Sequence, residues 1–106
     1  MAASIKTAEF QAKVLDSKVP VVVDFYATWC GPCRMQGPIL DELSRNAGGA
    51  FDVVKVDVDN EPDLAVKYGV TALPTLIVFD GGEPVEKFVG LTSKDVLSRA
   101  VKSTAS

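Results

Sequence analysis

The sequence contains no histidine, and it holds only two cysteines and one tryptophan. Without an imidazole, the chain by itself offers no histidine base for catalysis and no histidine ligand for a metal. Two cysteines are too few for a four-thiolate zinc site, which would need carboxylates or a second subunit to complete it. We therefore expect no bound metal and no cofactor.

Long apolar runs and basic clusters are also lacking. No stretch approaches the roughly 20 apolar residues that a membrane-spanning helix needs, and the N-terminus has no apolar signal core. The 11 Lys and Arg residues and 14 Asp and Glu residues give a formal net charge of −3, which disfavours a nucleic-acid surface. We expect a protein that binds neither nucleic acid nor membrane and that is cytoplasmic or, alternatively, a matured organellar form.

The composition is that of one globular domain. The chain has 106 residues, of which 47% are hydrophobic and 24% are charged. A chain of this size buries on the order of 65% of its unfolded surface and needs no disulfide or metal to hold its core. There is no internal repeat, low-complexity tract or linker, so we expect a single domain over residues 1–106.

Hydrophobic periodicity predicts alternating helices and strands. Strands are expected at 19–27, 51–58, 74–79 and 85–89, with a short edge strand near 3–6 as a possible fifth. Helices are expected at 7–17, 33–47, 61–68 and from position 92 onward, with N-caps at Thr7, Asn60 and Thr92. The apolar stripe of the helix at 33–47 consists of Met35, Ile39, Leu40 and Leu43.

The order of these elements predicts the fold class. A strand–helix–strand unit at 19–58 implies a parallel pair with a right-handed crossover, and the strands at 74–89 imply an antiparallel hairpin. We therefore expect an α/β protein with a mixed central sheet of four to five strands and helices on both faces. Local rules do not decide the direction of the third long strand.

Cys30 and Cys33 stand between a buried strand and an amphipathic helix. Positions i and i+3 of a first helical turn lie about 5–6 Å apart at Cβ, close enough for a disulfide after a small adjustment. The helix N-terminus favours a thiolate at Cys30, which makes Cys30 the better nucleophile and Cys33 the resolving thiol. Gly31 keeps the approach open, and Pro32 fits an early helical position. Such pairs also occur in metal sites and as inert core residues, but this context favours redox chemistry.

Three further residues are candidates for the site. Asp24 lies within an apolar strand, where burial would raise its pKa by up to about 3–5 units and let it accept the Cys33 proton; alternatively it reaches solvent or a turn N–H. Lys55 could approach Asp24 from the next strand, or it could be a surface lysine that covers apolar atoms with its stem. Pro74 starts a strand, and local rules give cis geometry to only about 5–6% of such bonds.

The run Val-Asp-Phe-Tyr-Ala-Thr-Trp-Cys-Gly-Pro-Cys at 23–33 resembles the active-site signature of the thioredoxin family. Further positions agree in order and spacing: Pro38, Lys55-Val56-Asp57, Ala72-Leu73-Pro74-Thr75, Gly82 and Gly90. The resemblance covers about residues 5–102. Tyr26, Thr28 and the Gln36-Gly37 pair depart from the usual pattern, which affects partner preference and stability rather than the chemistry.

The resemblance implies a thioredoxin fold and dithiol–disulfide exchange with protein substrates. It implies that Cys30 attacks, that Cys33 resolves, and that Asp24 with Lys55 assists proton transfer. It makes Pro74 a cis-proline that faces the disulfide and keeps metals from the thiols. The implied substrate-docking surface consists of Trp29, Gly31, Pro32, Ala72, Leu73, Pro74 and Gly90.

The partners that the resemblance implies are disulfide-containing proteins and a thioredoxin reductase, and we expect a monomer. The Gly-Pro dipeptide between the cysteines resembles the reducing members of the family. Two other functions stay open. The domain could be a folded subunit of another assembly with incidental thiols, or it could be a disulfide isomerase or oxidant, which the Gly-Pro dipeptide disfavours.

Overall fold

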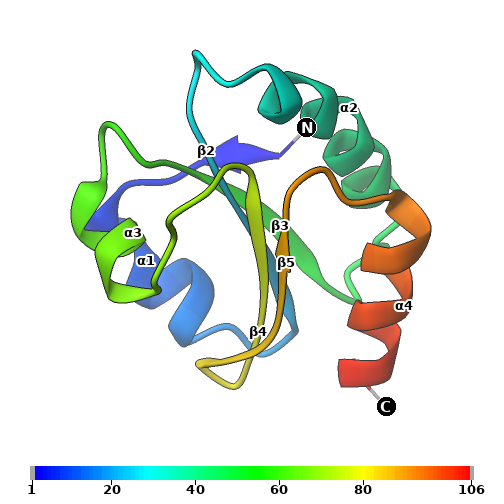
Figure 1. Ribbon diagram of the computed structural model, residues 1–106. Coiled ribbons are helices and arrows are strands. Elements are labelled where there is room, and N and C mark those ends of the chain that lie inside the picture. Colours follow the sequence, from blue (N-terminus) through cyan, green and yellow to red (C-terminus); the bar gives the residue numbers. More distant parts are fainter. Residues whose placement is uncertain (1, 106) are drawn as a thin grey trace.

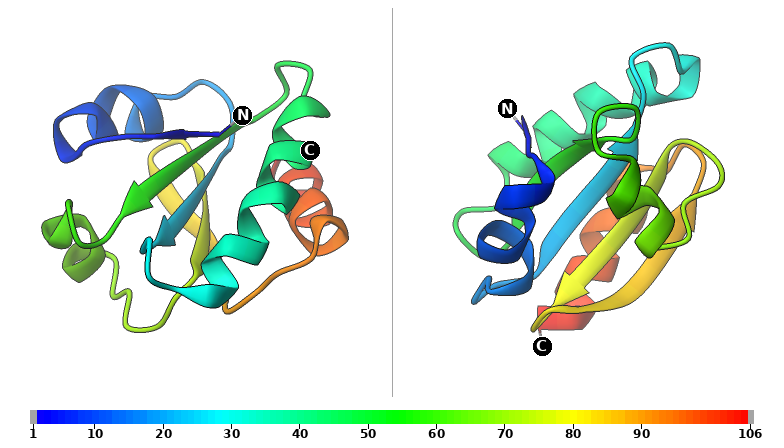
Figure 2. Two further views of the ribbon diagram at one scale, coloured as in Figure 1. Left: turned by 90° about the horizontal axis from the view of Figure 1, so that it is seen from above. Right: turned by 90° about the vertical axis from the view of Figure 1, so that its left-hand side faces the viewer.

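The computed structural model describes residues 2–105 and shows a five-stranded sheet between two layers of helices (Figure 1, Figure 2). The strands are β1 (Ala3–Ser4), β2 (Val21–Tyr26), β3 (Asp52–Asp57), β4 (Thr75–Asp80) and β5 (Glu83–Val89). The helical segments are α1 (Thr7–Phe10) with its π-helical continuation η1 (Gln11–Leu15), α2 (Gly31–Arg45), α3 (Pro62–Lys67) and α4 (Lys94–Ala105). The predicted fold class is confirmed, with the edge strand as the fifth strand.

The strand order β1-β3-β2-β4-β5 puts β2 at the centre of the sheet. Strand β3 is parallel to both β1 and β2, whereas β4 is antiparallel to β2 and β5 is antiparallel to β4. The direction of β4, which local rules left open, is thereby settled. Because Phe25 pairs with Thr75, the end of β2 lies beside the start of β4. This arrangement brings the cysteine motif next to the segment that contains Pro74.

Alternate side chains of the central strands build a separate core on each face of the sheet. One core joins α1, η1 and α3 to the sheet and contains Ile5, Phe10, Val14, Val21, Val23, Phe25, Val54, Val56, Leu64, Ile77 and Phe79. The other joins α2 and α4 to the sheet and contains Val22, Leu40, Leu43, Val53, Leu76, Val78, Leu97, Ala100 and Val101. The two helical layers lie on opposite sides of the sheet in Figure 2.

The predicted apolar stripe of α2 is wrong at one position. Met35 is 62% exposed, whereas Gln36 is completely buried. Gln36 shares a face with Leu40 because the two lie four residues apart, and Met35 is turned about 100° away from that face. The polar side chain can occupy this buried position because its amide is hydrogen-bonded to the backbone of Thr92.

The three predicted N-caps are each one residue away from the actual ones. Helix α1 begins after Lys6, α3 begins after Glu61, and α4 begins after Ser93. The Ser93 hydroxyl accepts a hydrogen bond from the Val96 N–H at 3.2 Å, which is the bond that a serine N-cap makes. Within residues 2–105, no helix combines the length and apolarity that a membrane span requires.

Candidate active site

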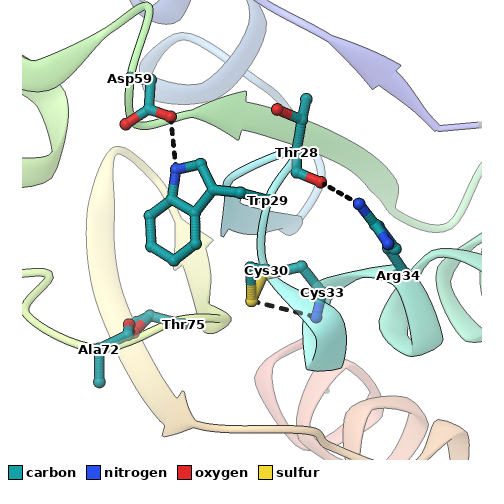
Figure 3. The surroundings of a disulfide bond; sticks show 8 residues. All are labelled: Thr28, Trp29, Cys30, Cys33, Arg34, Asp59, Ala72 and Thr75. Atoms are coloured by element: carbon teal, nitrogen blue, oxygen red, sulfur yellow. Dashed lines mark hydrogen bonds between the residues drawn. A yellow bond between two sulfur atoms is a disulfide. The ribbon is translucent and has the colours of Figure 1, made fainter.

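Cys30 and Cys33 are joined by a disulfide at the start of α2 (Figure 3). Their Cα atoms are 5.2 Å apart, a normal distance for a disulfide. Cys30 is the N-cap of α2, and its sulfur accepts a hydrogen bond from the Cys33 N–H at 3.3 Å. The same N–H and the helix macrodipole would stabilise a thiolate at Cys30. In the part of the chain that the structure describes, no three acidic or thiol side chains gather where they could hold one metal ion.

Two hydrogen bonds hold the loop that precedes α2 (Figure 3). The Trp29 Nε1 donates to the Asp59 carboxylate at 2.8 Å, and the Arg34 guanidinium donates to the Thr28 carbonyl at 3.1 Å. Trp29 is nevertheless 67% exposed, so a large apolar side chain is held at the surface beside the disulfide. The sequence singled out Trp29 but not Asp59, because the two are 30 positions apart and no local pattern connects them.

An apolar groove of about 620 Å³ opens beside Cys30. The predicted docking or site residues that line it are Trp29, Cys30, Gly31, Pro32, Ala72 and Leu73. The sequence did not identify the rest of its lining, which is Val58, Pro62, Ala65, Val66, Val70 and Thr71. Of these residues, Val66 could have been identified from the sequence, because it is an apolar residue on the outer face of a short predicted helix. In the structure it is 80% exposed.

Pro74 and Gly90 are not part of the groove lining, although both were predicted to belong to the docking surface. The Leu73–Pro74 peptide bond is cis, as the family resemblance implied. The Gly90 N–H donates a hydrogen bond to the Pro74 carbonyl at 2.8 Å, so the two loops that carry these residues are joined. Leu73, next to Pro74, packs against the buried cluster that contains both cysteines.

Asp24 is completely buried, and neither of its carboxylate oxygens has a hydrogen-bond partner within the described part of the chain. Burial raises its pKa to about 7, and the positive charge of Lys55 partly offsets this effect. The alternative in which Asp24 reaches solvent or a turn N–H is therefore wrong. The structure instead provides a carboxyl group that changes its charge near neutral pH.

Lys55 lies opposite Asp24 in the register of β2 and β3. Its ammonium is 4.3 Å from the centre of the Tyr26 ring, and the Tyr26 hydroxyl shares a hydrogen bond with the Ser4 hydroxyl at 2.7 Å. The charge of Lys55 therefore acts on Asp24 across space rather than through a hydrogen bond.

A second cavity of about 240 Å³ lies near this group of residues. Its lining consists of Tyr26, Ala27, Thr28, Cys33, Arg34 and Lys55. The two cysteines thus line different spaces: Cys30 lines the large apolar groove, and Cys33 lines the smaller cavity together with Lys55. The site combines a helix-capping cysteine, a second cysteine that lines a cavity together with Lys55, and an apolar surface for docking.

Comparisons with known proteins agree with this chemistry. The family model named Thioredoxin matches residues 1–103. A protein named Thioredoxin 1 from Nostoc sp. is 46% identical over 101 residues, which are 95% of this chain and 94% of the relative. Thioredoxin M4, chloroplastic, from Arabidopsis thaliana is 40% identical over 99 residues, which are 93% of this chain and 51% of that protein. A bifunctional thioredoxin reductase/thioredoxin from Mycobacterium leprae is 45% identical over 95 residues, which are 90% of this chain and 21% of that protein.

Proposed function

The chain belongs to the thioredoxin family of thiol–disulfide oxidoreductases, and from this premise we propose that it reduces protein disulfides with Cys30 as the attacking thiol and Cys33 as the resolving thiol. One observation carries this division of roles: Cys30 lines the groove where a substrate would dock, whereas Cys33 lines the smaller cavity beside Lys55. A substrate disulfide therefore meets Cys30 first.

The exchange proceeds in two steps that move two electrons to the substrate. The Cys30 thiolate attacks one sulfur of the substrate disulfide, which forms a mixed disulfide and releases the other substrate sulfur as a thiolate. The Cys33 thiol then loses its proton and attacks the Cys30 sulfur. This second attack releases the remaining substrate thiolate and leaves the Cys30–Cys33 disulfide that the structure contains.

Asp24 is the group that we assign to accept the Cys33 proton, directly or through water. A pKa of about 7 leaves the carboxyl partly ionised near neutral pH, where it can both take and return a proton. No hydrogen bond from the described residues competes for its oxygens. The positive charge of Lys55 keeps this pKa from rising further.

A reductase must return two electrons to the Cys30–Cys33 disulfide after each cycle, and we assign this role to a thioredoxin reductase. The bifunctional relative supports the pairing, because its name joins the two activities in one protein. We propose a cytoplasmic monomer whose substrates are disulfide-containing proteins. A matured organellar form is the alternative, since one relative is named as chloroplastic.

The role of each thiol can be tested by trapping the mixed disulfide. A Cys33→Ser variant keeps the attacking thiol but cannot resolve, so it should accumulate a covalent complex with a substrate such as insulin on non-reducing electrophoresis. The matched control is Cys30→Ser, which should trap none. Trapping by Cys30→Ser in place of Cys33→Ser would reverse the two roles. Failure of the unmodified protein to reduce insulin with NADPH and a thioredoxin reductase would remove the reductant function itself.

A further inference from the structure

We propose that Gln36 is a positioning residue for protein substrates, because a relay of hydrogen bonds connects it to the segment that carries Leu73 into the docking groove. The proposal deepens the function above and rests on it. Gln36 lies in α2, three residues after Cys33, and is completely buried, as is Leu40 of the same helix. The connection from β5 to α4 passes beside α2 (Figure 1), and its Thr92 is hydrogen-bonded to Gln36.

The Gln36 amide pairs with the backbone of Thr92 as another peptide group would. Its Nε2 donates to the Thr92 carbonyl at 2.9 Å, and its Oε1 accepts from the Thr92 N–H at 2.8 Å. Two antiparallel bonds fix both the position and the orientation of the Thr92 peptide groups. They also settle which end of the amide is the oxygen. In the reversed orientation, the amide NH₂ would face the Thr92 N–H, and the amide oxygen would face the Thr92 carbonyl oxygen.

The relay continues from Thr92 to the segment before β4. The Thr92 hydroxyl donates to the Gly90 carbonyl at 2.9 Å, and the Gly90 N–H donates to the Pro74 carbonyl at 2.8 Å. Gly90 has a φ of +92°, a backbone conformation that glycine adopts without steric cost and that other residues rarely adopt. Pro74 follows Leu73, which lines the docking groove and packs against the two cysteines.

A polar side chain at this depth is not explained by packing alone. The neighbouring core positions Leu40 and Leu43 are apolar, and an apolar residue would avoid the cost of removing an amide from water. A buried amide with hydrogen bonds at both ends restricts its neighbours to one arrangement, which dispersion contacts do less well. The arrangement that Gln36 restricts is that of the Gly90–Thr92 segment and, through the Gly90–Pro74 hydrogen bond, of the segment that carries Leu73 into the groove.

The relay should matter for large substrates and much less for small ones. A protein substrate must lay a segment of chain along the groove that Ala72 and Leu73 help to line, so displacement of this segment weakens docking. A small aromatic disulfide needs only access to the Cys30 sulfur. The diagnostic quantity is therefore the ratio of kcat/KM for insulin to kcat/KM for 5,5′-dithiobis(2-nitrobenzoic acid).

The experiment compares two variants of the relay with one control. Gln36→Met removes both hydrogen bonds of the side-chain amide while keeping a similar side-chain volume. Thr92→Val removes only the hydrogen bond from the Thr92 hydroxyl to the Gly90 carbonyl. The control is Val101→Ala, which weakens the same core from α4 without touching the loops. We expect each relay variant to lower the ratio of kcat/KM for insulin to kcat/KM for the small disulfide roughly fivefold, mainly through KM, because each variant interrupts the relay at one point. We expect the double variant to be no worse than either single one, because both break the same relay.

Hydrogen exchange at the Gly90 amide gives a second readout that does not depend on activity. This N–H does not contact Gln36, so faster exchange in Gln36→Met but not in Val101→Ala would show that the effect passes along the relay. An equal fall of the insulin ratio in all three variants, or an unchanged Gly90 exchange rate, would overturn the proposal. If the unmodified protein fails to reduce insulin, the proposed function is wrong, and the exchange measurement still decides whether the relay exists.

Discussion

A buried carboxyl group without a hydrogen-bond partner is expensive for any protein to keep. Asp24 is such a group, and its pKa is raised to about 7 by burial. Because the folded state holds this proton more tightly than the unfolded chain does, the proton contributes stability below the ordinary aspartate pKa near 4. That contribution is lost as the pH rises through the folded pKa. At neutral pH the chain therefore retains Asp24 at a cost in stability.

Replacing Asp24 with asparagine should stabilise the protein in a pH-dependent way. The asparagine side chain cannot ionise. The Asp24→Asn variant should therefore lack the loss of stability that ionisation of Asp24 causes between pH 4 and pH 8. Over that range the advantage of the variant should grow by up to about 4 kcal/mol, measured as the difference in free energy of unfolding in urea. A constant difference between the two proteins across this range would mean that Asp24 does not titrate with the raised pKa.

The same substitution should slow the chemistry that Asp24 serves. An amide cannot accept the Cys33 proton, so resolution of a mixed disulfide formed at Cys30 should slow by about 10²-fold, the lower range for loss of a general base. Stopped-flow measurement of substrate release against pH should also lose the inflection near pH 7. If the resolution rate and its pH profile are unchanged in Asp24→Asn, Asp24 has no part in the proton transfer.

At the scale of single elements, the hairpin between β4 and β5 shows how a two-residue turn depends on its glycines. Gly81 and Gly82 have φ values of 59° and 83°, which fit a hairpin turn with positive φ at both central residues. A Cβ on Gly82 would lie 3.1 Å from the backbone oxygen of Leu15, whereas a Cβ on Gly81 would meet open space. The turn is thus packed against η1 on one side only.

The two glycines form a matched pair for a stability measurement. Gly81→Ala should lower the free energy of unfolding by about 1 kcal/mol, because alanine is strained at positive φ. Gly82→Ala carries the same backbone strain and adds a tight contact with the Leu15 carbonyl oxygen, so its cost should exceed that of Gly81→Ala by about 1 kcal/mol. Urea unfolding of both variants measures the difference. Equal costs would show that the contact with Leu15 has no energetic weight.

The sequence was sufficient where a pattern is local. The runs of Val21 to Phe25 and Thr75 to Phe79 specify strands by composition, and the spacing of Cys30 and Cys33 specifies a thiol pair on one helical turn. The burial of Asp24 also followed from its position in an apolar strand, and the structure confirms it. These features depend on neighbours within a few residues.

The features that the sequence could not provide depend on distant partners. Gln36 is buried only because Thr92, 56 positions away, supplies two hydrogen bonds. Thr92 in turn looked like a helix cap, although its N–H is used by Gln36 and the next residue, Ser93, caps the helix. The position of Lys55 over the Tyr26 ring likewise required the β2–β3 register. Tertiary pairing, rather than local propensity, decided each of these.

At the scale of the whole molecule, the two cores are inseparable because they share the same strands. Val22 faces the α2 and α4 side, while its neighbours Val21 and Val23 face the side of α1, η1 and α3. Melting either helical layer would expose one face of β2 to water while the other face stayed buried. The active site needs both layers as well, since the groove is lined from α2 and α3 together. We therefore propose that the chain unfolds as one domain.

This proposal can be tested by weakening one core and observing the other. Val14 on η1 is 1% exposed and Val101 on α4 is 2% exposed, and they belong to opposite cores. Truncating either to alanine should cost about 2 kcal/mol and shift one shared urea transition, followed by far-UV circular dichroism and tyrosine fluorescence. Because unfolding is global, Val14→Ala should also speed hydrogen exchange of the slowest α4 amides as much as Val101→Ala does. Two separate transitions, or α4 amides that do not respond to Val14→Ala, would show that each face of the sheet unfolds on its own.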